Sequence, residues 1–568
     1  MTAPRPGTAV RLANLGWLPP AWALGWTIVL GAAFFSLSWP YVDVVNVLRD
    51  ATSWGWQDSV RNAFSRDVEY RPLFTLGVKA AYQIVGLRLW LYQGLVLLQF
   101  AAVLALLIWA FRPVSARRAI AACVALSCVV GLHSTRILFG FWPLNHHSGG
   151  LVLLLLATML ALDPRTRPRD WIYLPLTLAA LLLLESGLII APLLAILWWA
   201  GAPGVSLRGV LGAAGGVAVY LVIRLGLGAV GDSLGIYTSS GLGFSDVNPE
   251  TLRNIFEHAP WLFWSYNIVA TFLTVLVSEP RAGVYRFVDS LLRGDTAFWQ
   301  WLQVGSSLLT TAVIVVGLAA SRPASTRDRL LLVAGITLVV FGSGLGFLYT
   351  RDRIALSAGV GYGMLLYVAR ARVLEDGLPQ GEWKRRLAYG AVAVIGVAWV
   401  VRSAETYFQL RDSAWDLHLE WTDRYTELGG PEQPQAEFLR SMRSAALNAT
   451  PADPRRDPAW TYTLFERRFR PGTDLATRTP DAVADNVARP PSSPFDIRWK
   501  PDVGEAARAR IEMELGLIEA SRVERDPSGR TWSYRLRQPS RDRVRAIVMN
   551  PVVEDTARID RERFEIEN

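Results

Sequence analysis

Acids and arginines gather between Asp43 and Leu73, directly after the first long apolar segment. Asp43 comes just past that segment, where a carboxylate beside a membrane-facing cavity can act as general base toward an incoming hydroxyl. The alternative interpretation of Asp43 is a helix cap or a solvated loop acid. Asp67 is the second candidate base because it lies close to Tyr70-Arg71-Pro72-Leu73, and Asp50, Asp58 and Glu69 compete with both.

Three arginines have the chemistry to bind a phosphate. Arg71 could pair a phosphate through its forked guanidinium, although an arginine at a membrane interface also snorkels without a ligand. Arg351 and Arg353 fall on the predicted extracytoplasmic side, against the positive-inside trend. Arginines there indicate an anionic partner such as a phosphate or pyrophosphate headgroup, and pairing with Asp352 is the alternative.

Neutral and acidic polar residues supply candidate substrate contacts. Tyr70 opens the Tyr-Arg-Pro-Leu motif, and His146 and His147 follow Asn145 in the second outer loop, which also holds His133. The histidine spacing matches no standard zinc pattern, so we expect sugar or acceptor binding, or a place at the headgroup level, and assign no metal ligand. Glu185 is either a substrate contact or a helix–helix hydrogen bond.

Composition defines the class of protein. The chain has 568 residues, of which 51% are hydrophobic and 19% are charged, with the charges in short clusters between apolar runs. That pattern is typical of a polytopic membrane protein. The net charge of +9 then reflects topology, and nucleic-acid binding is excluded because no basic stripe is interleaved with aromatic residues. Cys123 and Cys128 lie within one apolar run and are expected to be packed thiols.

The apolar runs predict a mainly α fold, a transmembrane bundle of about 11–12 spans. Several runs are short, which suits half-length helices around a cavity. The ambiguous segment 260–278 is apolar and aromatic. The other candidates are 21–39, 90–111, 118–138, 149–162, 171–185, 188–200, 209–229, 301–320, 329–349, 355–369 and 386–403.

Arginine placement predicts the orientation. The connections near 112–118, 165–169, 322–329 and 370–386 are short and basic, so the positive-inside rule places them in the cytoplasm. Loops 40–89, 139–148 and 350–354 then lie outside, with everything after 404. We expect 171–200 to be a helical hairpin that turns at Glu185, because a carboxylate in mid-bilayer costs about 3 kcal/mol. Residues 260–278 are then re-entrant or interfacial.

Residues 404–568 differ from the preceding 1–403. Apolar runs vanish, and 429–458 and 470–495 have the composition of linkers. Helical spacing over Gly504 to Ser521, and strand-like patterns over Thr531 to Leu536 and Arg543 to Met549, predict a small extracytoplasmic α/β domain. No phosphate-binding loop, dinucleotide fingerprint or nucleophile elbow is found.

The motifs, in their order, resemble the integral-membrane glycosyltransferases of the GT-C superfamily, in the branch of polyprenyl- or dolichyl-phosphate-sugar protein O-mannosyltransferases. The resemblance covers roughly the first 400 residues. The segments that match are Tyr41-Val42-Asp43-Val44, Phe64 to Leu73, Val85-Gly86-Leu87 with Tyr92, Leu184 to Leu188 with Pro192, and Asp352 to Gly361. The chain departs from the branch at Val44, Leu184, Ala355 and Ser357, and no tetratricopeptide tail follows.

The resemblance implies an inverting transfer from a polyprenyl-phosphate-linked sugar to a glycan, glycolipid or protein acceptor. Asp43 would deprotonate the acceptor, Arg71 or Arg353 would hold the phosphate, and the lipid tail would lie between helices. No cofactor is assigned, and a divalent cation stays open. The implied location is a bacterial inner membrane, with the site on its extracytoplasmic face. The alternatives are an O-antigen ligase or polymerase that uses a lipid diphosphate, and a non-enzymatic transporter or assembly protein.

Overall fold

The computed structural model describes most of the first 448 residues and four short strands after them. The described ranges are 15–40, 43–65, 70–140, 143–163, 169–226, 249–277, 284–294, 296–320, 325–350, 352–375, 382–423 and 436–448, residue 451, and 495–499, 522–525, 531–535 and 564–567.

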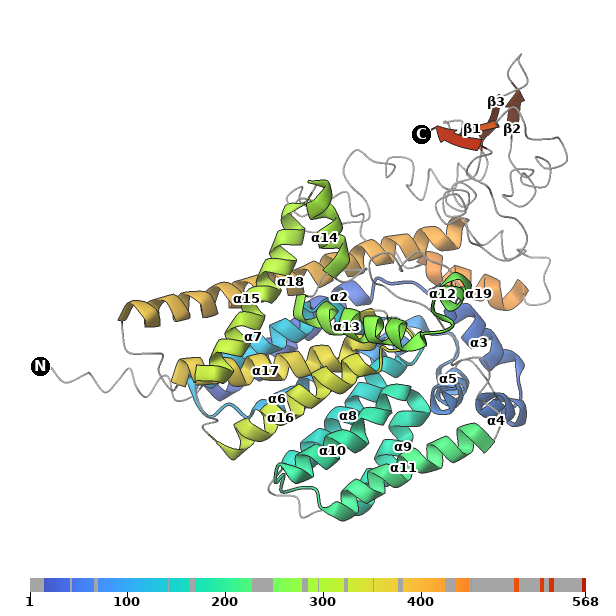
Figure 1. The fold of residues 1–568 in the computed structure, drawn as a ribbon. Helices are drawn as coiled ribbons and strands as arrows, with labels where there is room; N and C mark the ends of the chain where they lie inside the picture. Colours follow the sequence, from blue (N-terminus) through green and yellow to red (C-terminus); the bar gives the residue numbers. More distant parts are fainter. Residues whose placement is uncertain are drawn as a thin grey trace, which may run out of the picture.

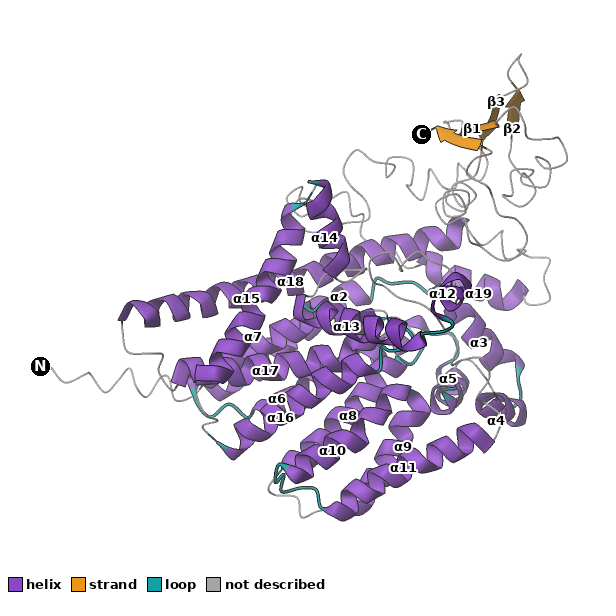
Figure 2. Cartoon of the chain, viewed as in Figure 1, coloured by secondary structure: helices purple, strands orange, loops and turns teal. Residues whose placement is uncertain are grey.

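Helices make up the described part of the first 448 residues (Figures 1 and 2). Those before residue 230 are η1 Leu15–Trp17, α2 Leu18–Phe34, α3 Asp43–Ser53, α4 Trp56–Ser65, α5 Pro72–Val85, α6 Leu89–Phe111, α7 Ala116–Gly131, η2 His133–Phe139, α8 His146–Leu162, η3 Asp170–Ile172, α9 Tyr173–Leu183, η4 Glu185–Ile189, α10 Ile190–Trp199 and α11 Leu207–Gly226. Those after it are α12 Pro249–Phe256, α13 Pro260–Val277, α14 Val284–Arg293, α15 Phe298–Ala320, α16 Thr326–Gly344, η6 Asp352–Ala355, α17 Leu356–Glu375, α18 Glu382–Asp423 and α19 Ala436–Asn448.

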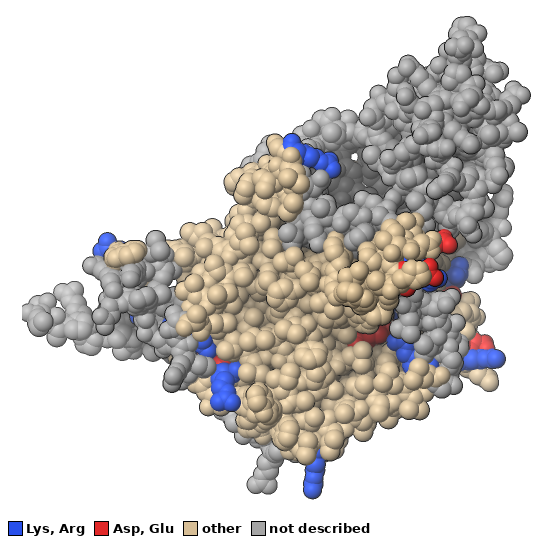
Figure 3. Space-filling model, viewed as in Figure 1, with Lys and Arg blue, Asp and Glu red and all other residues tan. Residues whose placement is uncertain are grey.

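The helices form a bundle around α17, which is buried over almost its whole length. Helices α7, α15 and α16 pack against α17, and α18 packs against α7 and α2. A second row continues from α2 through α6, α8 and α9 to α11. The described residues on the face visible in Figure 3 are mostly uncharged, with charged side chains mainly toward the edges of that described surface, as expected for a bundle surrounded by lipid.

Among the described residues, seven helices are long and apolar enough to cross a membrane, or eight if the bent pair of α7 and η2 counts as one span. They indicate a multi-pass membrane protein. The predicted 11–12 spans exceed this number because α8, the α9 segment and the α10 segment are shorter, and because the first turn of α16 contains Arg327, Asp328 and Arg329. Helix α13, over the ambiguous segment 260–278, meets the length criterion. It is therefore one of the seven helices that could cross, whereas the sequence predicts a re-entrant or interfacial segment. Its end lies beside the middle of α15, where Thr311 donates to the Leu276 carbonyl, and the re-entrant or interfacial placement stays a prediction.

The segment 40–89, predicted as a loop, is instead largely helical. Helices α3 and α4 are amphipathic, and their apolar residues are too sparse to form the continuous runs by which spans were recognised. Helix α5 begins at Pro72, a residue favoured in the first turn, and ends at Gly86, whose φ of 60° suits glycine. The Lys79 ammonium of α5 donates to the carbonyls of Ala51 and Trp54 at the end of α3. This cap fixes α3 against α5.

The predicted hairpin over 171–200 is confirmed. Helix α9 ends at Leu183, and η4 turns the chain so that α10 runs back. The ends of the hairpin meet, because Ser206, just after α10, donates to Asp170 at the start of η3 at 2.6 Å. Gly187 lies so close to α9 that a Cβ there would be 2.6 Å from the Leu181 nitrogen. The turn therefore requires glycine and sets Glu185 at the end of both helices.

The predicted span 118–138 is broken rather than continuous. Helix α7 ends at Gly131, and η2 leaves it at 78°. Asn145 then joins η2 to α8: its amide donates to the carbonyls of Ile137 and Gly140, and its Oδ1 caps α8 by accepting from the Ser148 N–H at 3.1 Å. On the other side of η2, Arg136 forms an ion pair with Glu405 of α18 at 2.9 Å. The break thus places the start of α8 inside the bundle, where His146 and His147 are buried.

Two of the four basic connections predicted as cytoplasmic, those near 112–118 and 322–329, meet at one end of the bundle through their described residues. Arg118 at the start of α7 binds Asp328 in the first turn of α16 through two bonds of 3.0 and 2.9 Å. Arg327 caps the end of α6 at Ala110, and Arg329 caps the α10 segment at Ala200. The segment that follows the opposite end of α16 belongs to the cavity described below.

Helix α18 crosses the predicted domain division between 403 and 404, because it continues to Asp423. The predicted linker 429–458 contains α19, whose Leu439, Met442 and Ala446 belong to the same hydrophobic core as α3. Trp421 near the end of α18 donates to the Trp39 carbonyl at 2.6 Å. These contacts join residues up to 448 to the helical body.

Beyond residue 451 the structure describes an antiparallel sheet of four strands in the order β2-β3-β1-β4. The strands are β1 Phe495–Trp499, β2 Arg522–Arg525, β3 Thr531–Arg535 and β4 Phe564–Glu567. Strand β3 falls on the predicted strand Thr531 to Leu536. The predicted helix 504–521 and strand 543–549 lie outside the described residues, so the α/β domain stays a prediction.

Candidate functional site

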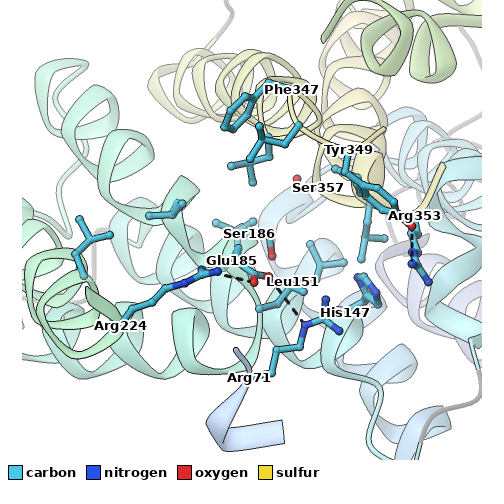
Figure 4. Close-up of a pocket in the computed structure, with 18 of the residues that line it drawn as sticks. Arg71, His147, Leu151, Glu185, Ser186, Arg224, Phe347, Tyr349, Arg353 and Ser357 are labelled. Atoms are coloured by element: carbon cyan, nitrogen blue, oxygen red, sulfur yellow. Dashed lines mark hydrogen bonds and ion pairs between the residues drawn. The ribbon is translucent and has the colours of Figure 1, made fainter. Parts of the chain in front are cut away.

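One cavity of about 620 Å³ gathers four of the nine predicted site residues. Arg71, His147, Glu185 and Arg353 line it, although they lie on four separate segments of the chain (Figure 4). Its remaining lining is mostly leucine, from α8, η4, α11 and α17 and from the residues before η4 and after α16. The apolar side chains are Leu151, Leu154, Leu184, Leu188, Leu221, Leu225, Leu345, Phe347, Leu348, Ile354 and Leu356.

Glu185 lies between two arginines. Its Oε2 is 4.0 Å from Arg71 Nε, and its Oε1 is 3.8 Å from Arg224 Nη1. Both distances exceed those of hydrogen bonds, so charge attraction alone holds the carboxylate. One third of the Glu185 side chain is exposed to the cavity. No hydrogen bond from Glu185 to another helix is present among the described residues, so that alternative is not seen, and a substrate contact stays a prediction.

Arg224 is a site residue that the sequence interpretation missed. It lies in the last turn of α11 and donates to the Tyr220 hydroxyl at 2.8 Å. Its guanidinium also lies over the rings of Tyr70 and Tyr220, at 5.7 and 5.9 Å. An arginine near the outer end of a predicted span contradicts the positive-inside trend, the signal that had singled out Arg353.

Tyr70 is fully buried beneath Arg224 rather than on the cavity wall. Its ring meets that of Tyr220 edge to face at 5.8 Å. Burial raises the pKa of Tyr70, and the nearby Arg224 offsets part of the rise, so the phenol stays protonated at neutral pH. The structure therefore gives Tyr70 the position of a support for Arg224, where the sequence predicted a substrate contact.

His146 and His147 begin α8, just before the predicted span 149–162. Arg71 Nη1 is 3.1 Å from His146 Nε2, and because a guanidinium only donates, this imidazole nitrogen accepts. Burial first, then the charges of Arg71 and Arg353, lower the pKa of His147 to about 3. Burial likewise lowers the pKa of His146. Both imidazoles are therefore neutral at physiological pH and can hydrogen-bond a ligand without adding charge.

Within the described part of the chain, Arg353 forms no ion pair with Glu185, unlike Arg71 and Arg224. Its Nη2 donates to the Tyr349 hydroxyl at 2.9 Å, and both side chains border the cavity (Figure 4). The described lining residues carry three positive charges, from Arg71, Arg224 and Arg353, and one negative charge, from Glu185. The cavity can therefore hold an anionic group next to an apolar chain.

The candidate bases are less completely described. Asp43 is the first residue of α3, and its side chain lies outside the described residues, as do Asp67 and Arg351. Asp50, one of the competing acids, lies two turns further along α3 and borders a small pocket of about 20 Å³ that also includes Arg71. Among the described residues, no group of three or more His, Cys, Asp or Glu side chains could hold a metal ion.

Comparison with known proteins finds no matching family model, no matching curated protein and no matching solved structure.

Proposed function

We propose that this chain is a membrane glycosyltransferase that moves a sugar from a polyprenyl phosphate to an extracytoplasmic glycan, lipid or protein. The observation that carries the proposal is the cavity in which Arg71, Arg224 and Arg353 adjoin a leucine-rich wall. A polyprenyl-phosphate sugar has the matching parts: an anionic phosphate, a sugar with hydroxyls for Glu185 and His147, and an apolar tail. In this proposal the cavity faces the outside of a bacterial inner membrane.

In the proposed reaction Asp43 accepts the proton of the acceptor hydroxyl while the hydroxyl oxygen attacks the anomeric carbon. The bond between that carbon and the phosphate oxygen breaks, and its electron pair leaves with the lipid phosphate. Arginines stabilise the charge that develops on the leaving phosphate. A single displacement inverts the anomeric centre. The Lys79 cap on α3 supports this assignment, because it fixes the helix that begins with Asp43 against the one that follows Arg71.

An apolar groove offers room for the lipid tail. It has a volume of about 410 Å³ and lies between the α10 segment and α16. Its lining runs along α16 from Arg329 to Phe341, four residues before Leu345 of the cavity. An isoprenoid tail in this groove would keep its phosphate at the arginines.

The test is transfer by the purified protein in nanodiscs, with labelled polyprenyl-phosphate sugars and a membrane glycolipid extract as acceptor. Wild type should transfer, and Asp43→Asn should lose at least about 100-fold of the rate, the usual contribution of a general base. The control is Glu257→Gln, which removes the charge of an exposed acid after α12 outside the cavity. If Asp43→Asn is fully active, the base is another acid, and Asp67→Asn is examined next. No transfer from any monophosphate donor would refute the proposal.

The separate position of Arg353 favours a second candidate, a ligase or polymerase that uses a lipid diphosphate. Arg71 and Arg224 could hold one phosphate while Arg353 holds the other. Such an enzyme would transfer from a lipid-diphosphate glycan and would leave lipid diphosphate as product. Mass spectrometry of the released lipid therefore discriminates the two functions.

A further inference from the structure

The position of Glu185 suggests that it competes with the ligand for the arginines. Its two carboxylate oxygens face Arg71 and Arg224 separately, at 4.0 and 3.8 Å (Figure 4). A phosphate ester offers oxygens at a similar spacing and bonds guanidinium groups more strongly. The place of the carboxylate between the two arginines is thus also a suitable place for a phosphate.

The contacts of Arg224 fix the position of its guanidinium. Tyr220 accepts one of its N–H groups, and the buried rings of Tyr70 and Tyr220 lie beside its guanidinium. The Tyr70 hydroxyl has no hydrogen-bond partner among the described residues, so its ring serves packing. A guanidinium held against two aromatic rings loses little further freedom when it binds an anion.

The Glu185 side chain, by contrast, can move away from both arginines. It makes no hydrogen bond among the described residues, and its side chain is one-third exposed. Its backbone is fixed by the close approach of Gly187 to α9, so a departure would involve the side chain alone.

We infer that Arg71 and Arg224 form a clamp for an anionic phosphate ester and that Glu185 occupies this clamp as an internal counter-ion until the phosphate displaces it. The leucines of α11 and η4 on the cavity wall point to a phosphate carried by a lipid. Once displaced, the Glu185 carboxylate is available to the sugar hydroxyls. The lipid and sugar parts of this inference rest on the proposed function, whereas the clamp itself does not.

Binding measurements without turnover test the clamp. The probes are polyprenyl phosphate without sugar, in nanodiscs of neutral phospholipid, and inorganic phosphate. Glu185→Gln should bind polyprenyl phosphate about tenfold more tightly than wild type, because two weak charge pairs no longer compete. Arg224→Gln should bind it at least about tenfold more weakly. The matched control is Glu257→Gln, the same change at an exposed acid after α12 that does not line the cavity, and its affinity should equal that of wild type.

Combining the changes separates competition from a general charge effect. In the Arg224→Gln background, the gain from Glu185→Gln should shrink to about threefold, because only Arg71 remains for the carboxylate to occupy. If Arg224→Gln does not fold, Arg224→Lys keeps the charge without the fork and should also weaken binding.

Unchanged or weaker binding of polyprenyl phosphate by Glu185→Gln would overturn the counter-ion role, as would an undiminished gain in the Arg224→Gln background. Inorganic phosphate that binds as tightly as polyprenyl phosphate would overturn the lipid as its source. If these binding results hold while no sugar is transferred, the proposed function fails and the clamp stands.

Discussion

Glu405→Leu probes the buried charge cluster that ties η2 to α18. Glu405 is 1% exposed, and its carboxylate lies 2.9 Å from Arg136 Nη2. It also accepts amide N–H bonds from Gln303 at 3.0 Å and Gln409 at 2.9 Å. At an effective dielectric constant of about 20, the attraction at this distance is about 6 kcal/mol, much of which desolvation offsets.

Removal of the carboxylate leaves the Arg136 guanidinium buried without a counter-ion among the described residues. Breaking a buried pair from one side costs about 3–5 kcal/mol, and we expect the lower end because the Arg136 side chain is 12% exposed and can draw in water. The assay is reversible unfolding in mixed micelles with increasing SDS, followed by circular dichroism.

The double variant Arg136→Met with Glu405→Leu is the decisive comparison. Replacing both charges by apolar residues of similar size removes the unpaired Arg136 charge but leaves the amides of Gln303 and Gln409 without their acceptor, so stability should recover only in part and stay about 1–2 kcal/mol below wild type. Asp58→Asn, at an exposed acid, should change stability by less than about 0.5 kcal/mol. A loss below about 1 kcal/mol for Glu405→Leu, or simple additivity in the double variant, would show that the pair does not hold η2 in place.

Three further predictions follow from other contacts. Asn145→Ala should lower stability by about 2–4 kcal/mol in thermal unfolding, because one N-cap and its buried carbonyl contacts are lost together; a loss under about 1 kcal/mol would contradict this. Lys79→Met should reduce hydrogen-exchange protection in α3 more than in α5, and equal loss would argue against the cap. The pKa of His147 is about 3 in the folded chain and about 6.5 in the unfolded chain. Between about pH 3 and about pH 6.5 the unfolded chain therefore binds one more proton at His147 than the folded chain does. Stability should therefore fall as pH drops below about 6.5, and His147→Gln should flatten that slope by up to about 1.4 kcal/mol per pH unit; an unchanged slope would refute it.

Sequence patterns predicted the parts of the fold that depend on continuous apolar runs. They also named Arg71, His147, Glu185 and Arg353 as separate candidate site residues on one predicted face, and the structure places all four on the wall of one cavity. The hairpin at Glu185 followed from the cost of burying a carboxylate in lipid.

The features that the sequence did not predict are amphipathic helices and contacts between segments that are distant in the sequence. Helices α3, α4 and α19 bury only one stripe, so a search for apolar runs does not detect them. Arg224 joins the site because α11 packs against α9 and brings its last turn to Glu185, a contact that no local pattern encodes. The break at Leu132 depends on tertiary packing, since Gly131 lies against the α18 backbone at Ser403.

The bond between Trp421 and the Trp39 carbonyl has a consequence for synthesis. The two residues are 382 positions apart, and Trp39 precedes Asp43 by four. At a translation rate of about 5–20 residues per second, Trp39 waits roughly 20–80 s for its partner. During that interval the segment that leads into α3 lacks its final anchor. A nascent chain that is already inserted into the bilayer would therefore lack this bond until the end of α18 has left the ribosome.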